Sequence, residues 1–209
     1  MGIAFLANHK KGPTATTNFK NTPKIVSTTT LQEYDRVING CRELFVKKTQ
    51  DYGTSWRVLR LPSITDQIFI KAQRIRSIQE KGKQLVEDDI SGEFIGIINY
   101  CVMALIQQNL PESAELHLPA EQVKSLYNEQ VEITRQLFLA KNHDYGEAWR
   151  DMRVSSITDI ILMKLYRTKQ IEDNEGQTLI SEGVEANYRD MINYAVFALI
   201  KSGFAETAK

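Results

Sequence analysis

The stretch "KNHDYGEAWRDMRVSSITD", residues 141–159, decides the fold because the chain carries it twice. A near copy, "KTQDYGTSWRVLRLPSITD", stands at residues 48–66. Sliding the chain by 93 positions aligns residues 41–78 with 134–171, and 18 of these 38 positions are identical, so the two regions are copies of one unit. An internal repeat fixes the architecture before any other signal is read.

Each copy holds three helical patterns, in which apolar residues recur at steps of three and four. The first pattern ends on a lysine in both copies, Lys48 and Lys141. The second begins at "SITD", where we expect Ser63 and Ser156 to be N-caps, as Thr30 is expected to be for the first helix. The third contains "IINYCVMALI" in one copy and "MINYAVFALI" in the other, offset by 94 because one residue is inserted.

These patterns predict an all-α protein. A three-helix unit buries little surface alone, so we expect the two repeats to pack about a pseudo-twofold axis into one six-helix bundle. The predicted organisation is a mobile N-terminal arm over 1–29, repeats over 30–109 and 121–209, and a proline-containing linker over 110–120.

Composition narrows the class of protein. Apolar residues make up 42% of the 209 residues and the formal net charge is zero, which argues against a broad nucleic-acid-binding surface. No apolar run appears long enough in the sequence to span a membrane, and Cys41 and Cys101 fit buried thiols in a reducing compartment. We therefore expect a cytoplasmic protein without a membrane partner, and the sequence leaves a homodimer open.

The identities between the copies are mostly polar, which points to a site. Lys48, Lys71 and their counterparts Lys141 and Lys164 lie within apolar stripes, so each needs an anion from the protein or from a ligand. A phosphorylated ligand suits a group of lysines and arginines. The candidate substrate-binding residues are Lys48, Asp51, Tyr52, Arg57, Arg60, Lys71, Arg74, Lys141, Tyr145, Trp149, Arg150, Arg153, Lys164, Arg167 and Asn193.

The "DYG" triplet and the tryptophan after it each allow two interpretations. Gly53 and Gly146 fit the left-handed residue that ends a helix, with the preceding tyrosine packed on a neighbouring helix. Trp56 and Trp149 fit the core, although either ring is also suited to stack on a base.

The third helix of the second copy concentrates acids. Glu185 and Asp190 are candidate ligands for Mg²⁺, and Asp190 with Asp144 are the candidate catalytic residues. The first copy has Gly96 where Asp190 is expected, so an acidic site belongs to the second copy. Acidic side chains at a helix N-terminus also interact favourably with the helix dipole, and this alternative explains Glu185 better than Asp190.

The strings "KNHDYGEAW" and "RDMINYAVFAL", with Lys164 and Arg167 between them, resemble the nucleotide modification associated domain 1 family over roughly residues 31–203. The resemblance implies a helical domain associated with nucleotide or DNA modification. By looser analogy the chain is similar to the all-α nucleoside triphosphate pyrophosphatases of the MazG type, which hold Mg²⁺ and a nucleotide. It lacks their paired glutamates on the second helix, where lysine and arginine stand instead.

Three functions follow as hypotheses. The first is a protein that binds a nucleotide or nucleoside phosphate between its repeats. The second is a Mg²⁺-dependent nucleoside triphosphate pyrophosphohydrolase. The third is a helical interaction module without a small ligand, whose lysines are all paired with internal carboxylates.

Overall fold

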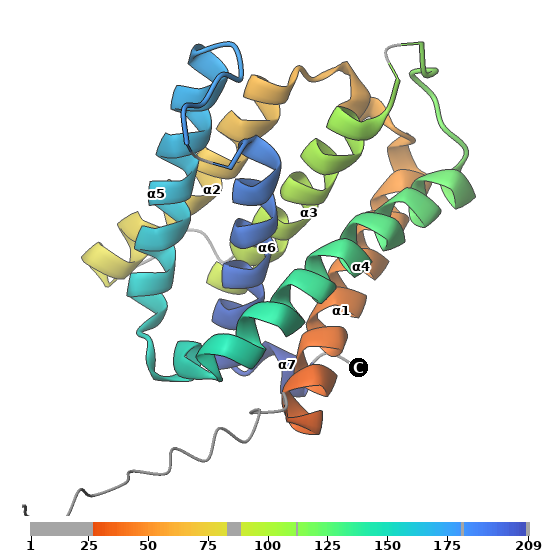
Figure 1. Ribbon diagram of the computed structural model, residues 1–209. Helices are drawn as coiled ribbons and strands as arrows, with labels where there is room; N and C mark the ends of the chain where they lie inside the picture. Colours follow the sequence, from red (N-terminus) through yellow and green to blue (C-terminus); the bar gives the residue numbers. More distant parts are fainter. Residues whose placement is uncertain (1–26, 83–88, 112, 181, 208–209) are drawn as a thin grey trace, which may run out of the picture.

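The computed structural model describes residues 27–82, 89–111, 113–180 and 182–207. Within these ranges it contains helices and no strand, as the sequence predicts. Six long helices form a bundle, joined by two short 3-10 turns and followed by one short terminal helix (Figure 1). They are α1 (Thr28–Tyr52), η1 (Ser55–Val58), α2 (Leu61–Lys81), α3 (Ile90–Asn109), α4 (Ala120–Tyr145), η2 (Ala148–Asp151), α5 (Val154–Asp173), α6 (Val184–Lys201) and α7 (Phe204–Thr207).

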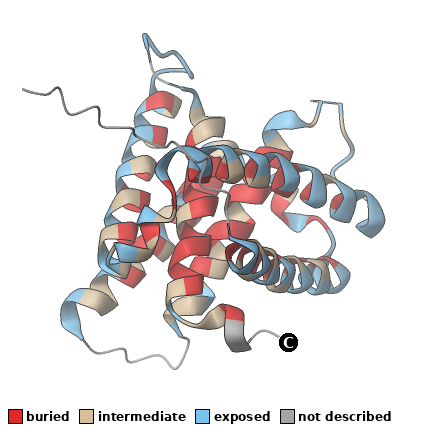
Figure 2. Ribbon diagram, turned by 60° about the horizontal axis from the view of Figure 1, so that its bottom comes forward, coloured by how far each residue is buried: buried red, intermediate tan, exposed pale blue. Residues whose placement is uncertain are grey.

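The core lies where the third helices of the two repeats meet. Helix α3 packs against α6, α2 packs against α3, and α5 packs against α6. Buried residues follow these central helices, whereas the outer faces are exposed (Figure 2). Tyr34, Tyr127, Phe45 and Phe138 complete the core from α1 and α4.

Matched contacts establish the pseudo-twofold relation between the repeats. The Tyr34 hydroxyl donates to Asn193 at 2.8 Å, and its counterpart Tyr127 donates to Asn99 at 2.9 Å. The first helix of each repeat thus binds the third helix of the other repeat. The two units are interlocked, which explains how three-helix units share one core.

The outer helices α2 and α5 also contact each other through a pair of matched ionic contacts. Lys169 lies 2.6 Å from Asp66, and its counterpart Arg76 lies 3.7 Å from Asp159. These pairs are largely exposed, so they fix the register of the two helices more than they stabilise the fold.

Three local predictions are wrong. Helices α2 and α5 begin two residues before Ser63 and Ser156, with Arg60 and Arg153 as the N-cap residues. Pro62 occupies the first turn of α2, where its missing N–H costs no hydrogen bond. Helix α1 is capped by Ser27, whose hydroxyl accepts from the Thr30 amide at 3.1 Å, so Thr30 is not the cap.

Two further expectations concern the N-terminal arm and the absence of a membrane-spanning stretch. Most of the predicted arm, residues 1–26, lies outside the described residues. Helix α3 meets the length and composition of a membrane span, contrary to the sequence expectation. Half of that span is buried among other helices, and the core helix of a bundle passes the same test.

Candidate functional site

Two pockets occupy matched positions in the two repeats. The first-repeat pocket has a volume of about 410 Å³ and lies between the end of α1, η1 and the start of α3. The second-repeat pocket has about 450 Å³ and lies between the end of α4, η2 and α6. Every residue that lines either pocket comes from a single repeat, so these cavities differ from the site between repeats that the sequence suggested.

The "DYG" corner shapes the mouth of both pockets. Gly53 and Gly146 have φ of 63° and 65° with ψ of −144° and −151°. This conformation is open to glycine and lies outside the left-handed helical region that we expected. It turns the chain from the first helix into the 3-10 segment. Tyr52 and Tyr145 stand at the rims, 60% and 77% exposed, rather than packed on a neighbouring helix.

Both tryptophans are buried, as the core interpretation predicts. Trp56 is tilted against Phe45, and Trp149 stacks on Phe197 at 4.4 Å between ring centroids. The indole N–H of each finds no acceptor among the described residues. Trp149 already contacts Phe197 and the Arg150 guanidinium with its ring, so a base is better placed beside its edge than on its face.

In the second-repeat pocket the carboxylate of Asp190 pairs with two lysines, of which Lys141 lines the pocket and Lys164 does not. Asp190 accepts from Lys141 at 2.5 Å through Oδ1 and from Lys164 at 2.6 Å through Oδ2. Its side chain is only 10% exposed, and Lys164 is 13% exposed. Burial, followed by the charge of Asp190, raises the pKa of the neighbouring Tyr194 hydroxyl. Asp190 therefore occupies the position in which an anionic ligand would meet both ammonium groups.

In the first repeat the carboxylate that pairs with the lysine stands at a different position on the third helix. Gly96 stands at the position of Asp190, and Lys71 fills that space, with its Cε 2.6 Å from an ideal Gly96 Cβ. Lys71 pairs instead with Glu93 at 3.1 Å, one helical turn earlier on α3, and Arg74 contacts the same carboxylate. Glu93 does not line the pocket. Sequence analysis missed it because the second copy has Asn187 at this position.

Lys48 is left without an anion. Its counterpart Lys141 reaches Asp190, but Lys48 is exposed at the first-repeat pocket and has no hydrogen-bond or ion-pair partner in the described part of the chain. The described residues that line this pocket include two lysines and no carboxylate. The first-repeat pocket is thus cationic, in contrast to its counterpart.

The first arginine of the repeated string, Arg57 in one copy and Arg150 in the other, makes contacts within the protein that hold neighbouring segments in place. Arg57 donates to Gln107 at 2.8 Å and to the carbonyls of Ala114 and Glu115 at 3.1 Å, which holds the segment that leads into α4. Arg150 contacts Glu33 at 2.5 Å and Thr30 at 2.7 Å, and so holds the start of α1. These contacts use most of the donors that we assigned to phosphate; the Arg57 Nε is buried and has no partner among the described residues.

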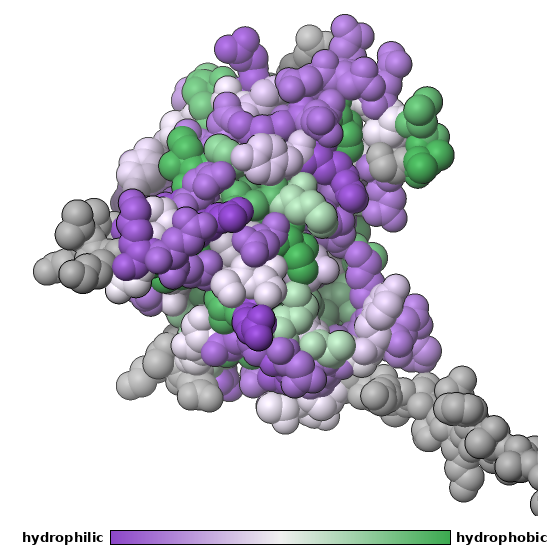
Figure 3. All heavy atoms as spheres, turned by 90° about the vertical axis from the view of Figure 1, so that its left-hand side faces the viewer, coloured by the Kyte–Doolittle hydropathy of each residue, from purple (hydrophilic) through white to green (hydrophobic). Residues whose placement is uncertain are grey.

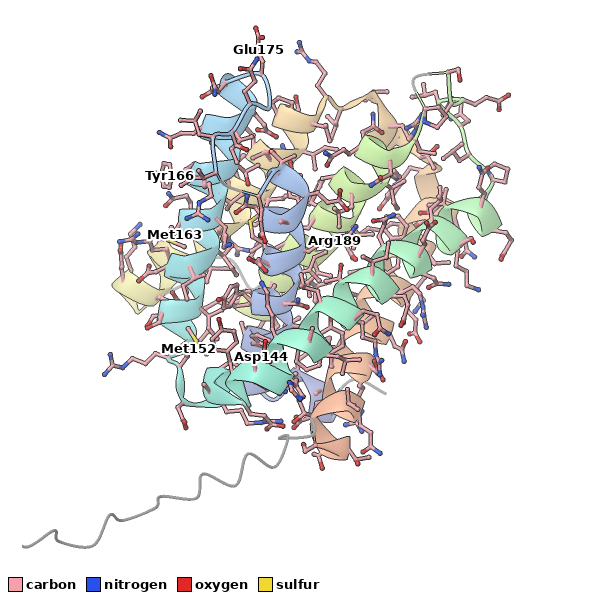
Figure 4. The ribbon with its side chains drawn as sticks, in the orientation of Figure 1. Asp144, Met152, Met163, Tyr166, Glu175 and Arg189 are labelled. Carbon is pink, nitrogen blue, oxygen red and sulfur yellow. The ribbon has the colours of Figure 1, made fainter. Side chains whose placement is uncertain are left out.

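Other predicted site residues lie apart from the pockets. Arg60 and Arg153 are exposed helix caps, and Arg167 lines a separate hollow beside Asn174. Asp51 and Asp144 are exposed; Asp144, near the end of α4 in Figure 4, contacts His143 at 3.1 Å.

The predicted Mg²⁺ ligands Glu185 and Asp190 are each engaged in ion pairs with cationic side chains. No three His, Cys, Asp or Glu side chains come together within the described ranges. Glu185 pairs with the buried Arg189 at 2.5 Å and lines a different hollow, while both oxygens of Asp190 accept from lysines. Asn193 lines the second-repeat pocket, but its carbonyl accepts from Tyr34. Because these carboxylates are paired with lysine and arginine side chains, they are less suited to bind a divalent cation.

The fold and pockets define an all-α protein made of two copies of one pocket-bearing unit. The family model of nucleotide modification associated domain 1 matches residues 48–108 and again 141–201. The two matches cover more than half of the chain, which therefore belongs to this family. Each match begins at the pocket lysine, Lys48 or Lys141, and ends in the third helix. No curated protein matches the chain, and no solved structure does.

Proposed function

We propose that the protein binds a nucleotide or nucleoside phosphate in the first-repeat pocket. The observation that carries this proposal is a pocket whose described lining residues include two lysines, Lys48 and Lys71, and no carboxylate. A phosphate accepts charge-assisted hydrogen bonds from both ammonium groups, and Lys48 has no competing partner among the described residues. Gly92, in the first turn of α3, also lines this pocket, so the helix dipole adds to the attraction for an anion.

The remaining walls suit the organic part of such a ligand. Phe45, Leu59, Ile95 and Met103 line the pocket, and Trp56 adds an indole N–H that has no acceptor among the described residues. A volume of about 410 Å³ is within the range of small-molecule sites. Membership of a family named for nucleotide modification supports a nucleotide as the phosphorylated ligand.

A tryptophan in each pocket allows the sites to be observed separately. Trp56 and Trp149 are the only tryptophans in the chain, so Trp149→Phe leaves Trp56 as the reporter of the first-repeat pocket. Titration of this variant with ribo- and deoxynucleoside 5′-monophosphates, in the presence of a chelator, should give a saturable fluorescence change. The matched nucleosides should bind at least about 10-fold more weakly, because they lack the phosphate.

Lys48→Met in the same background should weaken nucleotide binding by about 10- to 100-fold. Lys47→Met is the matched control, since Lys47 is exposed and does not line the pocket. A flat response of Trp56 to every nucleotide at about 10 mM would overturn the proposal. Equal losses in the two lysine variants would overturn the assigned phosphate contact.

A further inference from the structure

The second-repeat pocket keeps the walls of a binding site but has lost its attraction for anions. Asp190 spans Lys141 and Lys164 with distances of 2.5 and 2.6 Å, so an arriving phosphate would meet a carboxylate in its place. Like charges in a partly buried site repel strongly, and displacing Asp190 would leave it without a cation. The pocket nevertheless remains open, with a volume of about 450 Å³.

Two buried donors in this pocket have no acceptor in the part of the chain that the structure describes. The Asn142 side-chain nitrogen and the Trp149 indole nitrogen have no hydrogen-bond partner among the described residues. Asn142 is 4% exposed and Trp149 6%, so water does not reach either side chain freely. An unsatisfied buried donor is costly, and a ligand acceptor would relieve that cost.

The differences between the pockets are complementary. At the position of Asn142 the first repeat has Thr49, whose hydroxyl donates to the carbonyl of its own helix at 3.0 Å and needs no ligand. The second repeat therefore has an amide without a partner among the described residues and a carboxylate at the positions where the first repeat has a satisfied hydroxyl and a glycine. Because of these two differences, we expect the first-repeat pocket to favour anionic ligands and the second-repeat pocket to favour uncharged ligands with hydrogen-bonding groups.

We propose that the second-repeat pocket binds an uncharged, planar heterocyclic ligand of the nucleobase or nucleoside class. Asn142 and Trp149 donate to ring or carbonyl acceptors, Asp190 accepts from an N–H or hydroxyl group, and the exposed Tyr145 ring covers the ligand at the rim. The heterocycle's identity as a nucleoside rests on the proposed nucleotide function. Its lack of charge rests on Asp190 alone.

The variant Trp56→Phe tests this pocket through Trp149, independently of the first site. Titration with nucleosides and with their 5′-monophosphates, in chelator, should give a saturable change with at least one nucleoside. The matched monophosphate should bind at least about 10-fold more weakly. If the proposed phosphate site is wrong, the Trp56 reporter is silent while Trp149 still responds. If the present inference is wrong, the reverse pattern appears.

Three substitutions separate the contributions of Asn142, Tyr145 and Asp190 to ligand binding. Asn142→Thr, which introduces the residue of the first repeat, should weaken nucleoside binding by about 10-fold. Tyr145→Leu should also weaken nucleoside binding, and because Tyr145 is exposed this variant leaves the core unchanged. Asp190→Asn should strengthen monophosphate binding at Trp149 by about 10-fold or more. Silence of Trp149 toward every nucleoside at about 10 mM, or equal affinity for nucleoside and monophosphate, would overturn the inference.

Discussion

The first-repeat and second-repeat pockets are lined largely by matched positions, but the carboxylates that pair with the lysines of the two repeats stand one helical turn apart on the third helix. In the first, Glu93 draws Lys71 and Arg74 toward the start of α3 and leaves Lys48 unpaired within the described residues. In the second, Asp190 draws both lysines inward. After duplication, the position of one acid on the third helix is thus enough to separate a cationic pocket from a neutralised one, without a change of fold.

The largest expected effect on stability comes from Asp190→Asn. Removing this charge leaves Lys141 and the largely buried Lys164 without their anion, so the free energy of unfolding should fall by about 2–3 kcal/mol. Urea denaturation at pH 7 measures the loss. Asp144→Asn is the control, because this side chain is 72% exposed and should change stability by less than about 0.5 kcal/mol. Similar losses in the two variants would contradict the assigned role of Asp190.

The second prediction makes the first repeat resemble the second. Gly96→Asp places a carboxylate against Lys71, whose flexible end lies 2.6 Å from the new Cβ and must move. Nucleotide affinity measured at Trp56 should fall by about 10- to 100-fold, because the new acid takes the place of the phosphate. Gly96→Asn is nearly identical in shape and uncharged. If it causes the same loss, sterics rather than charge would explain the result.

The third prediction concerns the arginine that both repeats share. Arg150→Met should lower the free energy of unfolding by about 1–2 kcal/mol, because contacts with Glu33 and Thr30 at the start of α1, and with Glu147 before η2, are lost. Nucleotide affinity at Trp56 should not change. Comparing urea denaturation with a fluorescence titration separates the two effects, and a stable variant with weaker binding would restore the phosphate role predicted from sequence.

The smallest expected effect is one of pH. Glu172 stands where the first repeat has Gln79, and burial raises the pKa of its carboxyl group despite hydrogen bonds from Thr65 and Tyr188. A raised pKa in the folded state means that the protonated form favours folding. The group's contribution is therefore present at acidic pH and lost as the pH rises through the raised pKa.

Glu172→Gln makes this position match the first repeat and removes the dependence. The variant should gain stability relative to the wild type as the pH increases from about 4 to 7. Chemical denaturation across this range measures the difference, and a difference that is constant with pH would exclude Glu172 as its source. Gln79→Glu introduces the same group in the first repeat, where Gln79 donates to Thr158 at 3.1 Å.

The architecture followed from the sequence because the repeat and the helical period are strong, long-range signals. The lysines Lys71 and Lys164 were recognised as inward-facing because they interrupt apolar stripes. The repeat pattern does not predict the contacts of Arg57 and Arg150, because Arg57 binds the segment that leads into α4 and Arg150 binds the first turns of α1, and a repeat carries no information about contacts to the other repeat. Glu93 was missed for a related reason, since it has no acidic counterpart in the second copy.

The possible homodimer remains a prediction. The outer face formed by α2 and α5 exposes Ile70, Met163 and Tyr166, and the last two are labelled in Figure 4. On the corresponding side of the molecule, apolar groups lie interspersed with hydrophilic ones rather than in one continuous patch (Figure 3). Sedimentation analysis of the purified chain measures its association state.

The central claim, that the position of one carboxylate decides which pocket accepts phosphate, is tested most directly by exchanging it. A protein carrying Gly96→Asp and Asp190→Gly is combined with Trp56→Phe or with Trp149→Phe, and each form is titrated with the nucleoside monophosphate that binds the parent protein best. The account predicts that the nucleotide response moves from Trp56 to Trp149. Nucleotide binding that stays at Trp56 in the exchanged, folded protein would contradict it.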